Sequence, residues 1–421
     1  MSAAISNPPL FDKEMRLLKI FGLSLYDNDS FAYKIYSGFC MIFIIFLYPV
    51  IDIMELFRYD FDGMAGIILY ATSITVLMFK SVMFYIHSSK FRDIIDCLQQ
   101  PPFTLDYERG GKKEEKLLKT AVQITTIQAW MYWLAAYGTI ALGMVYIIVS
   151  DLLHKPYRPM YGPISILNTT NLLNLRITVI YQEICMFYVG AHYTVVDLII
   201  VGILVHASYQ FKILQNNLVR IVGNSYRSMY SHHHVRDIVA FLKLNLKKAV
   251  KYHLEIVSLV DKLEYLCNEM FLIQFVMNLV VVCFQIYDAT KPSSTTAEAL
   301  SHIAEMICVV MQSSVLCYWA EQVIYESDNV GRSLFQTDFV GTDLKFQKLM
   351  ILVMRRTQNL TSVTAGKFKR VRLATLMWPI LIPKTNIRQL IVAVNWLRPI
   401  GRGTTACRRQ AVGKKRYYNE K

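Results

Sequence analysis

Charged residues are scarce in this chain of 421 residues, and their scarcity excludes an ordinary soluble protein. Asp, Glu, Lys and Arg make up 18% of the sequence, hydrophobic residues make up 54%, and the mean hydropathy is +0.32. A water-facing surface needs roughly a quarter of its residues charged. A chain this apolar must present much of its exterior to something other than water, and lipid is the obvious solvent.

Cysteine pairs of the metal-binding or redox kind are also missing. No two of the eight cysteines have CxxC spacing, and five lie in long apolar runs, where a thiol behaves as a small hydrophobic group. We therefore expect neither a disulfide framework nor zinc. The run His232, His233, His234 is not expected to bind a metal, because adjacent histidines on a helix point to different faces.

Motifs for catalysis are lacking too. No GxSxG, HExxH, Walker or GxGxxG string accompanies a suitable strand or helix. We expect no enzyme and no cofactor.

The net charge of +14 is concentrated at one end of the chain. Residues 371–421 hold 11 Lys and Arg but a single acid, Glu420, whereas the other 370 residues are nearly balanced, with 34 basic and 30 acidic groups. This distribution does not support a uniform basic surface, and we expect no nucleic-acid partner.

Long apolar runs are abundant. About 20 apolar residues are needed to cross a bilayer, and only helices can satisfy their backbone there as open-ended segments. The sequence therefore predicts an all-α membrane protein with six secure spans: Ile35–Phe57, Gly63–Ile86, Ile127–Val149, Glu183–Ala207, Met270–Ile286 and Ala299–Ile324.

The connections between the spans predict a cytoplasmic N-terminus. The leader and the connections on its side carry 28 Lys and Arg, against 5 on the other side, and basic residues favour the cytoplasmic side. No cleavable signal peptide is expected, because the first apolar run begins only near Ile35. Asn168 heads a glycosylation sequon in the expected outer loop between the third and fourth spans.

The long inner connection before the fifth span is amphipathic. Apolar residues between Val235 and Leu266 recur at three- and four-residue steps, opposite lysines such as Lys243 and Lys247. This pattern predicts a cytoplasmic extension of the membrane helices. The alternative is a basic helix lying on anionic lipid.

Several strings resemble the insect odorant receptor family, in the same order and membrane context over most of the chain. The fourth span leads through Asp197-Leu198 and His206 to Gln210-Phe211. His253, Leu263-Glu264 and Phe271 with Gln274-Phe275 follow. The longest group comprises Leu316-Cys317-Tyr318-Trp319, Glu321, Ser327, Asp338, Met354-Arg355-Arg356, Gln358 and Thr364-Ala365-Gly366-Lys367-Phe368.

The resemblance implies a seven-helix subunit of a ligand-gated, non-selective cation channel in the plasma membrane of olfactory sensory neurons. Such a subunit forms a tetramer with the odorant receptor co-receptor, has its N-terminus inside, and lines the pore with its seventh helix. The implied division is a leader (1–34), spans 1 to 4 with the odorant pocket (35–207), a cytoplasmic anchor (208–269), spans 5 and 6 (270–325), a second anchor segment (326–370) and the tail (371–421).

The pocket that the resemblance implies lies in the outer half of the subunit, among the second, third, fourth and sixth spans. An odorant site is mostly apolar and aromatic, with few polar atoms. For each candidate the alternative is plain core packing or an interfacial aromatic belt, and for His192 a structural hydrogen bond. The candidates are Tyr70, Thr72, Tyr137, Tyr146, Phe187, Tyr188, His192, Tyr193, Met306, Met311 and Gln312.

The charged residues within the spans include Lys80 and Asp197. Lys80 is expected to snorkel to the headgroups, and Asp197 to pair with a neighbouring helix or at the cytoplasmic mouth. Structural or gating roles are expected for Asp197, His206, Gln210, His253, Glu264, Glu321 and Gly366.

The resemblance stops after Phe368. Where a pore helix should follow, the apolar runs Leu373–Pro383 and Ile387–Leu397 have eleven residues each, about 16 Å of helix, and Pro379 interrupts the first. We therefore expect six spans and a basic cytoplasmic tail, and a non-conducting variant is an alternative.

Other classes remain as alternatives. A G-protein-coupled receptor conflicts with the orientation, and neither a DRY-like string nor NPxxY is present. A gustatory-type channel is disfavoured only by the strings above. A transporter or membrane enzyme would normally show charge pairs within the membrane, and none is apparent.

Overall fold

The computed structural model describes residues 10–25, 29–58, 61–153, 161, 171–231, 238–290 and 296–375. Asn168, the histidine run at His232 and the tail beyond 375 lie outside the described residues. The described chain is helical apart from one small hairpin. Its elements are α1 (Asp12–Ile20), α2 (Phe31–Cys40), the π-helix η1 (Met41–Phe46), α3 (Leu47–Leu56), α4 (Phe61–Ile86), α5 (Ser88–Leu98), α6 (Gly111–Leu152), α7 (Leu172–Val219), α8 (Ile221–Ser231), α9 (Ile238–Ala289), α10 (Thr296–Phe335), α11 (Leu344–Thr357), β1 (Thr364–Ala365) and β2 (Lys369–Arg370).

Within these residues, six helical stretches are long and apolar enough to cross a membrane. They match the six predicted spans in order, although the first predicted span ends one residue later, at Phe57, and the second begins three residues earlier, at Gly63. The all-α membrane architecture is therefore confirmed. The first is the continuous stretch α2-η1-α3. The π-helix precedes Pro49, which has no N–H to donate to the carbonyl four residues earlier, and such a loss favours an irregular turn.

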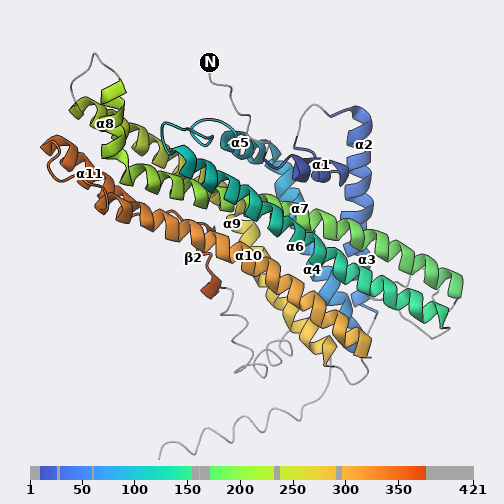
Figure 1. Ribbon diagram of the computed structural model, residues 1–421. Coiled ribbons are helices and arrows are strands. Elements are labelled where there is room, and N and C mark those ends of the chain that lie inside the picture. Colours follow the sequence, from blue (N-terminus) through green and yellow to red (C-terminus); the bar gives the residue numbers. More distant parts are fainter. Residues whose placement is uncertain are drawn as a thin grey trace, which may run out of the picture. The chain divides into compact units, whose positions relative to one another are not determined.

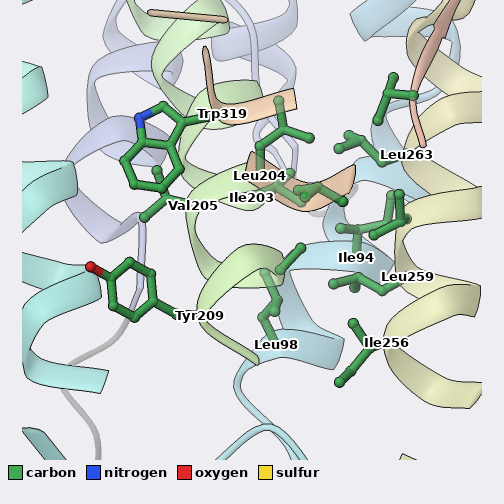
Figure 2. Close-up of a cluster of buried hydrophobic side chains, with 14 of the residues drawn as sticks. Ile94, Leu98, Ile203, Leu204, Val205, Tyr209, Ile256, Leu259, Leu263 and Trp319 are labelled. Carbon is green, nitrogen blue, oxygen red and sulfur yellow. The ribbon is translucent and has the colours of Figure 1, made fainter. Parts of the chain in front are cut away.

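Four long helices form the body of the bundle, in which α7 contacts α6, α9 and α10 (Figure 1). The amphipathic segment before the fifth span and that span itself form the single helix α9. The core lies along α7, which is buried almost without interruption from Tyr188 to Leu214. Figure 2 shows part of this core, where Ile94 and Leu98 of α5 face Ile256 and Leu259 of α9.

Helix α7 begins earlier than the sequence predicts. Leu172 starts the helix, eleven residues before Glu183, and the Asn171 side chain caps it by accepting the Leu173 N–H at 3.1 Å. The polar residues between Leu172 and Glu183 are more typical of a loop than of a membrane span. Arg176, however, pairs with Asp151 of α6 at 3.0 Å, and Glu183 is buried.

The leader packs along α7. The Phe11 ring meets His206 edge-on, with centroids 5.8 Å apart, and lies against Gly202, where any Cβ would overlap it. Further along, the Tyr188 hydroxyl donates to the carbonyl of Phe21. The Phe11 contact requires glycine at position 202.

The hairpin docks on α9. Gly366 has φ +59°, its N–H donates to the carbonyl of Asn268 at 2.8 Å, and a Cβ there would lie 2.6 Å from Leu272 Cδ2. Glycine alone fits this position without strain. Beside it, the Thr364 hydroxyl donates to Glu264 at 2.5 Å. Glu264 and Gly366 therefore hold the hairpin against the bundle.

Candidate ligand-binding site

A compact aromatic cluster lies between the membrane helices at the end of the bundle where α7 begins. We define the aromatic cluster by Tyr48 of α3, Tyr70 of α4 and Tyr161, together with the polar neighbours Glu183 of α7 and Glu305 of α10. The Tyr70 and Tyr161 rings meet edge-on, with centroids 5.3 Å apart. Apolar side chains surround them: Ile51, Leu69, Ile74, Leu77, Met186, Val189 and Val281.

Two carboxyl groups bracket the tyrosine pair. The Tyr70 hydroxyl donates to the two oxygens of Glu305 at 3.1 and 3.2 Å, and the Tyr161 hydroxyl donates to Glu183 at 3.5 Å. Tyr48 is fully buried. The arrangement combines a large apolar surface with a few polar atoms, as small-molecule sites do.

Five of the eleven predicted pocket residues fall into three groups. Tyr70 belongs to the aromatic cluster, and Tyr193 packs against it. Tyr188 instead lies in a small separate group with Cys40, where it contacts the leader. The ring of Tyr137 lies 5.3 Å from Trp133 and 4.7 Å from the exposed Phe187.

The remaining candidates have other surroundings. His192 is fully buried, with Nε2 3.1 Å from the Ser81 hydroxyl on α4, which is the structural hydrogen bond that the sequence left open. The backbone carbonyl of Gln312 accepts the Tyr132 hydroxyl at 3.1 Å. The other four are half-buried: Thr72, Tyr146, Met306 and Met311.

Several members of the aromatic cluster were missed from the sequence. Tyr48 lies on the first span, Tyr161 in a connection, and Glu305 on the sixth span, where the predicted pocket residues are all neutral. A usable signal existed, because an ionisable side chain inside an apolar span is costly and marks a functional site by default. Glu183 and Glu305 both carry that signal.

A buried ion pair links α4 and α7 next to the aromatic cluster. Lys80 Nζ lies 2.5 Å from Asp197 and 3.9 Å from the centre of the Tyr193 ring. Lys80 is 1% exposed, so the expectation that it snorkels to the headgroups is wrong: a buried carboxylate partner holds it inside the bundle. The pairing expected of Asp197 is found. The expectation that no charge pair lies within the spans is also wrong.

The other predicted structural residues make specific contacts. The Gln210 amide donates to the carbonyl of Phe103 at 3.0 Å, and the Tyr252 hydroxyl donates to the Gln210 oxygen. Glu321 accepts the Leu373 N–H at 3.2 Å. His253, on the part of α9 before the fifth span, packs on Phe211; burial and the charge of Arg356 lower the pKa of His253 to about 4.

A cleft lies at the other end of the bundle. It has a volume of about 620 Å³ and lies between α5, α9 and α11, lined by charged side chains that include Lys90, Asp93, Asp261, Lys262 and Arg356. Its mixed charge does not match an apolar volatile. In the described part of the chain, no group of three or more His, Cys, Asp and Glu could hold a metal ion.

Comparisons with known proteins agree on one family. The model of the family described as "7tm Odorant receptor" matches residues 62–378. Putative odorant receptor 92a of Drosophila melanogaster is 19% identical over 46% of this chain and 44% of its own length. Odorant receptor 67a of the same species is 29% identical over 27% and 28%. The chain thus covers less than half the length of these curated relatives.

The fold is similar to that of a solved receptor. The insect olfactory receptor OR5 from Machilis hrabei, determined alone and in complex with eugenol, superposes with a TM-score of 0.72 in both states at 13% identity. The match to the complex covers 90% of this chain and 97% of that one. With a family match across three quarters of the sequence and this likeness of fold, the chain belongs to the insect 7tm odorant receptor family.

Proposed function

We propose that this chain is the odorant-binding subunit of a ligand-gated, non-selective cation channel that it forms with the odorant receptor co-receptor. The match to the 7tm odorant receptor family carries the proposal, because this is a family of receptors and channels rather than of enzymes. The subunit resides in the plasma membrane of olfactory sensory neurons, with its N-terminus in the cytoplasm.

The odorant site of this proposal is the aromatic cluster. A solved relative of the same fold was determined in complex with eugenol, which supports a small organic ligand for this chain. The tyrosines supply apolar area together with hydroxyl groups. One methylene in such a site is worth about 1 to 3 kcal/mol, so graded tuning across related volatiles is expected.

The test is an electrical recording with a matched pair of variants. Cells that express this chain with the co-receptor are expected to give inward currents to some members of a volatile panel, and cells with the co-receptor alone are not. Tyr70→Phe removes the hydroxyl bonded to Glu305 and should shift the half-maximal concentration about three- to tenfold. Tyr85→Phe, at a site 62% exposed, should leave it unchanged.

A response indistinguishable between the two kinds of cell would contradict the proposal, provided that the chain reaches the surface. The composition of residues 371–421 favours a second candidate for that case, a subunit that assembles without completing the pore. Replacing this segment by a family-type terminal helix would then restore current.

A further inference from the structure

Four polar side chains in the aromatic cluster form a continuous row, Glu305, Tyr70, Tyr161 and Glu183. Three come from different helices, α10, α4 and α7, and Tyr161 comes from the connection before α7. The two tyrosines each donate their hydroxyl to one carboxyl group. Both hydroxyl donors are therefore occupied, and the row contains more hydrogen-bond acceptors than donors.

The unmatched atoms in this region include two acceptor oxygens, besides the hydroxyl of Tyr48. Glu183 Oε1 makes no hydrogen bond to a described residue, and Glu183 is 5% exposed. Gln285 of α9 lies beside Glu305, close enough for its amide to interact with that carboxyl group. Gln285 Oε1 also lacks a partner among the described residues, and Gln285 is 3% exposed. Leaving such buried atoms unpaired is unfavourable.

The described residues place no Lys or Arg in an ion pair with Glu183 or Glu305. The imidazole of His302 lies 4.0 Å from Glu305. The two cations on neighbouring parts of α4 and α7 are engaged elsewhere, Lys80 with Asp197 and Arg176 with Asp151. Buried carboxylates without a cation are unfavourable.

We propose that the aromatic cluster recognises a small ligand carrying a protonated amine on an apolar body. This inference rests on the proposed odorant-binding function and names the chemical class of the ligand. An ammonium group brings three donors and a positive charge, which complement a region that holds the carboxyl groups of Glu183 and Glu305 and the unpaired oxygen of Gln285. The Tyr70 and Tyr161 rings attract a cation, and Leu69, Ile74 and Val281 receive the apolar body.

The experiment measures binding, so it does not depend on ion conduction. The full-length chain in phosphatidylcholine nanodiscs is titrated by calorimetry at pH 7 with 2-phenylethylamine and with 2-phenylethanol, which share one body and differ in the polar group. The amine is expected to bind about tenfold tighter or more, as a charge-assisted hydrogen bond implies. Glu183→Gln and Glu305→Gln should each weaken amine binding about tenfold and change alcohol binding less than threefold.

Two controls keep the result interpretable. Glu115→Gln removes a carboxyl group that contacts Lys119 outside the cluster and should leave both affinities unchanged. Glu183→Asp keeps the charge and should retain the preference for the amine, even if Glu183→Gln does not fold. Equal affinity for the two ligands, or a preference that survives both Gln substitutions, would overturn the inference.

The inference and the proposed function fail separately. Currents evoked by neutral volatiles, without any preference for the amine in calorimetry, would overturn the amine class and leave the receptor function standing. Calorimetric preference for the amine, in a chain that gives no current with the co-receptor, would support the amine class and count against the channel function.

Discussion

Replacing Lys80 by methionine is expected to remove most of the folded protein. The substitution leaves the carboxylate of Asp197 buried without its cation, and breaking a buried pair on one side costs about 3 to 5 kcal/mol. A folded protein has only about 5 to 15 kcal/mol of stability in total. Asp197→Leu should be similarly damaging, because it strands the ammonium group.

The double variant distinguishes a charge effect from a packing effect. Lys80→Met with Asp197→Leu removes both charges, and such replacements are often neutral or stabilising, so it should recover folded protein. The measurement is the monodisperse fraction after solubilisation, together with the thermal midpoint. Asp151→Ala breaks the exposed pair with Arg176 and should cost less than about 1 kcal/mol. Single variants as stable as the wild type would show that the Lys80 pair contributes nothing.

Arg109→Met should cause the second large loss, at the opposite end of the bundle. The guanidinium donates to Glu114 and to the carbonyls of Pro102 and Thr104, and lies 4.4 Å from the centre of the Tyr252 ring. Burial alone would lower the pKa of Arg109, but hydrogen bonds and charge from Glu114 raise it. Glu114 itself is fully buried. Removing the guanidinium should cost about 3 to 5 kcal/mol.

Lysine should not rescue this site, because only a planar guanidinium reaches all three acceptors at once. The check is thermal unfolding of Arg109→Met and of Arg109→Lys, with Lys119→Ala as a separate control variant. Lys119 pairs with Glu115 on the surface of α6, and this exposed pair should contribute less than about 0.5 kcal/mol to stability. Equal midpoints for Arg109→Lys and the wild type would contradict the role given to the planar group.

The membrane helices could be predicted from the sequence because the bilayer imposes a length and a polarity on each span. Their ends could not. The sequence placed the start of the fourth span at Glu183, whereas α7 begins at Leu172, because Arg176 finds a partner on α6 that is far away in sequence. Hydropathy alone cannot recognise a charge that is neutralised by another helix.

The same limit explains why only part of the candidate site could be predicted from the sequence. Tyr70 could be predicted, because it is an aromatic residue in the outer half of the second span. Shifting the start of α7 by eleven residues moves Phe187, Tyr188 and His192 away from the beginning of their helix. Glu183 then occupies the part of α7 where the aromatic cluster forms. Partners for Lys80 and His192 depend on the register between α4 and α7, which composition does not contain.

Orientation in the membrane tests the receptor account most directly, because it decides which leaflet faces the aromatic cluster. An epitope fused before Met1 should be labelled by antibody only after the cells are permeabilised, whereas an epitope inserted between Leu153 and Asn171 should be labelled on intact cells. Labelling of the N-terminal epitope on intact, sealed cells would place the aromatic cluster on the cytoplasmic side and contradict its assignment as an odorant site.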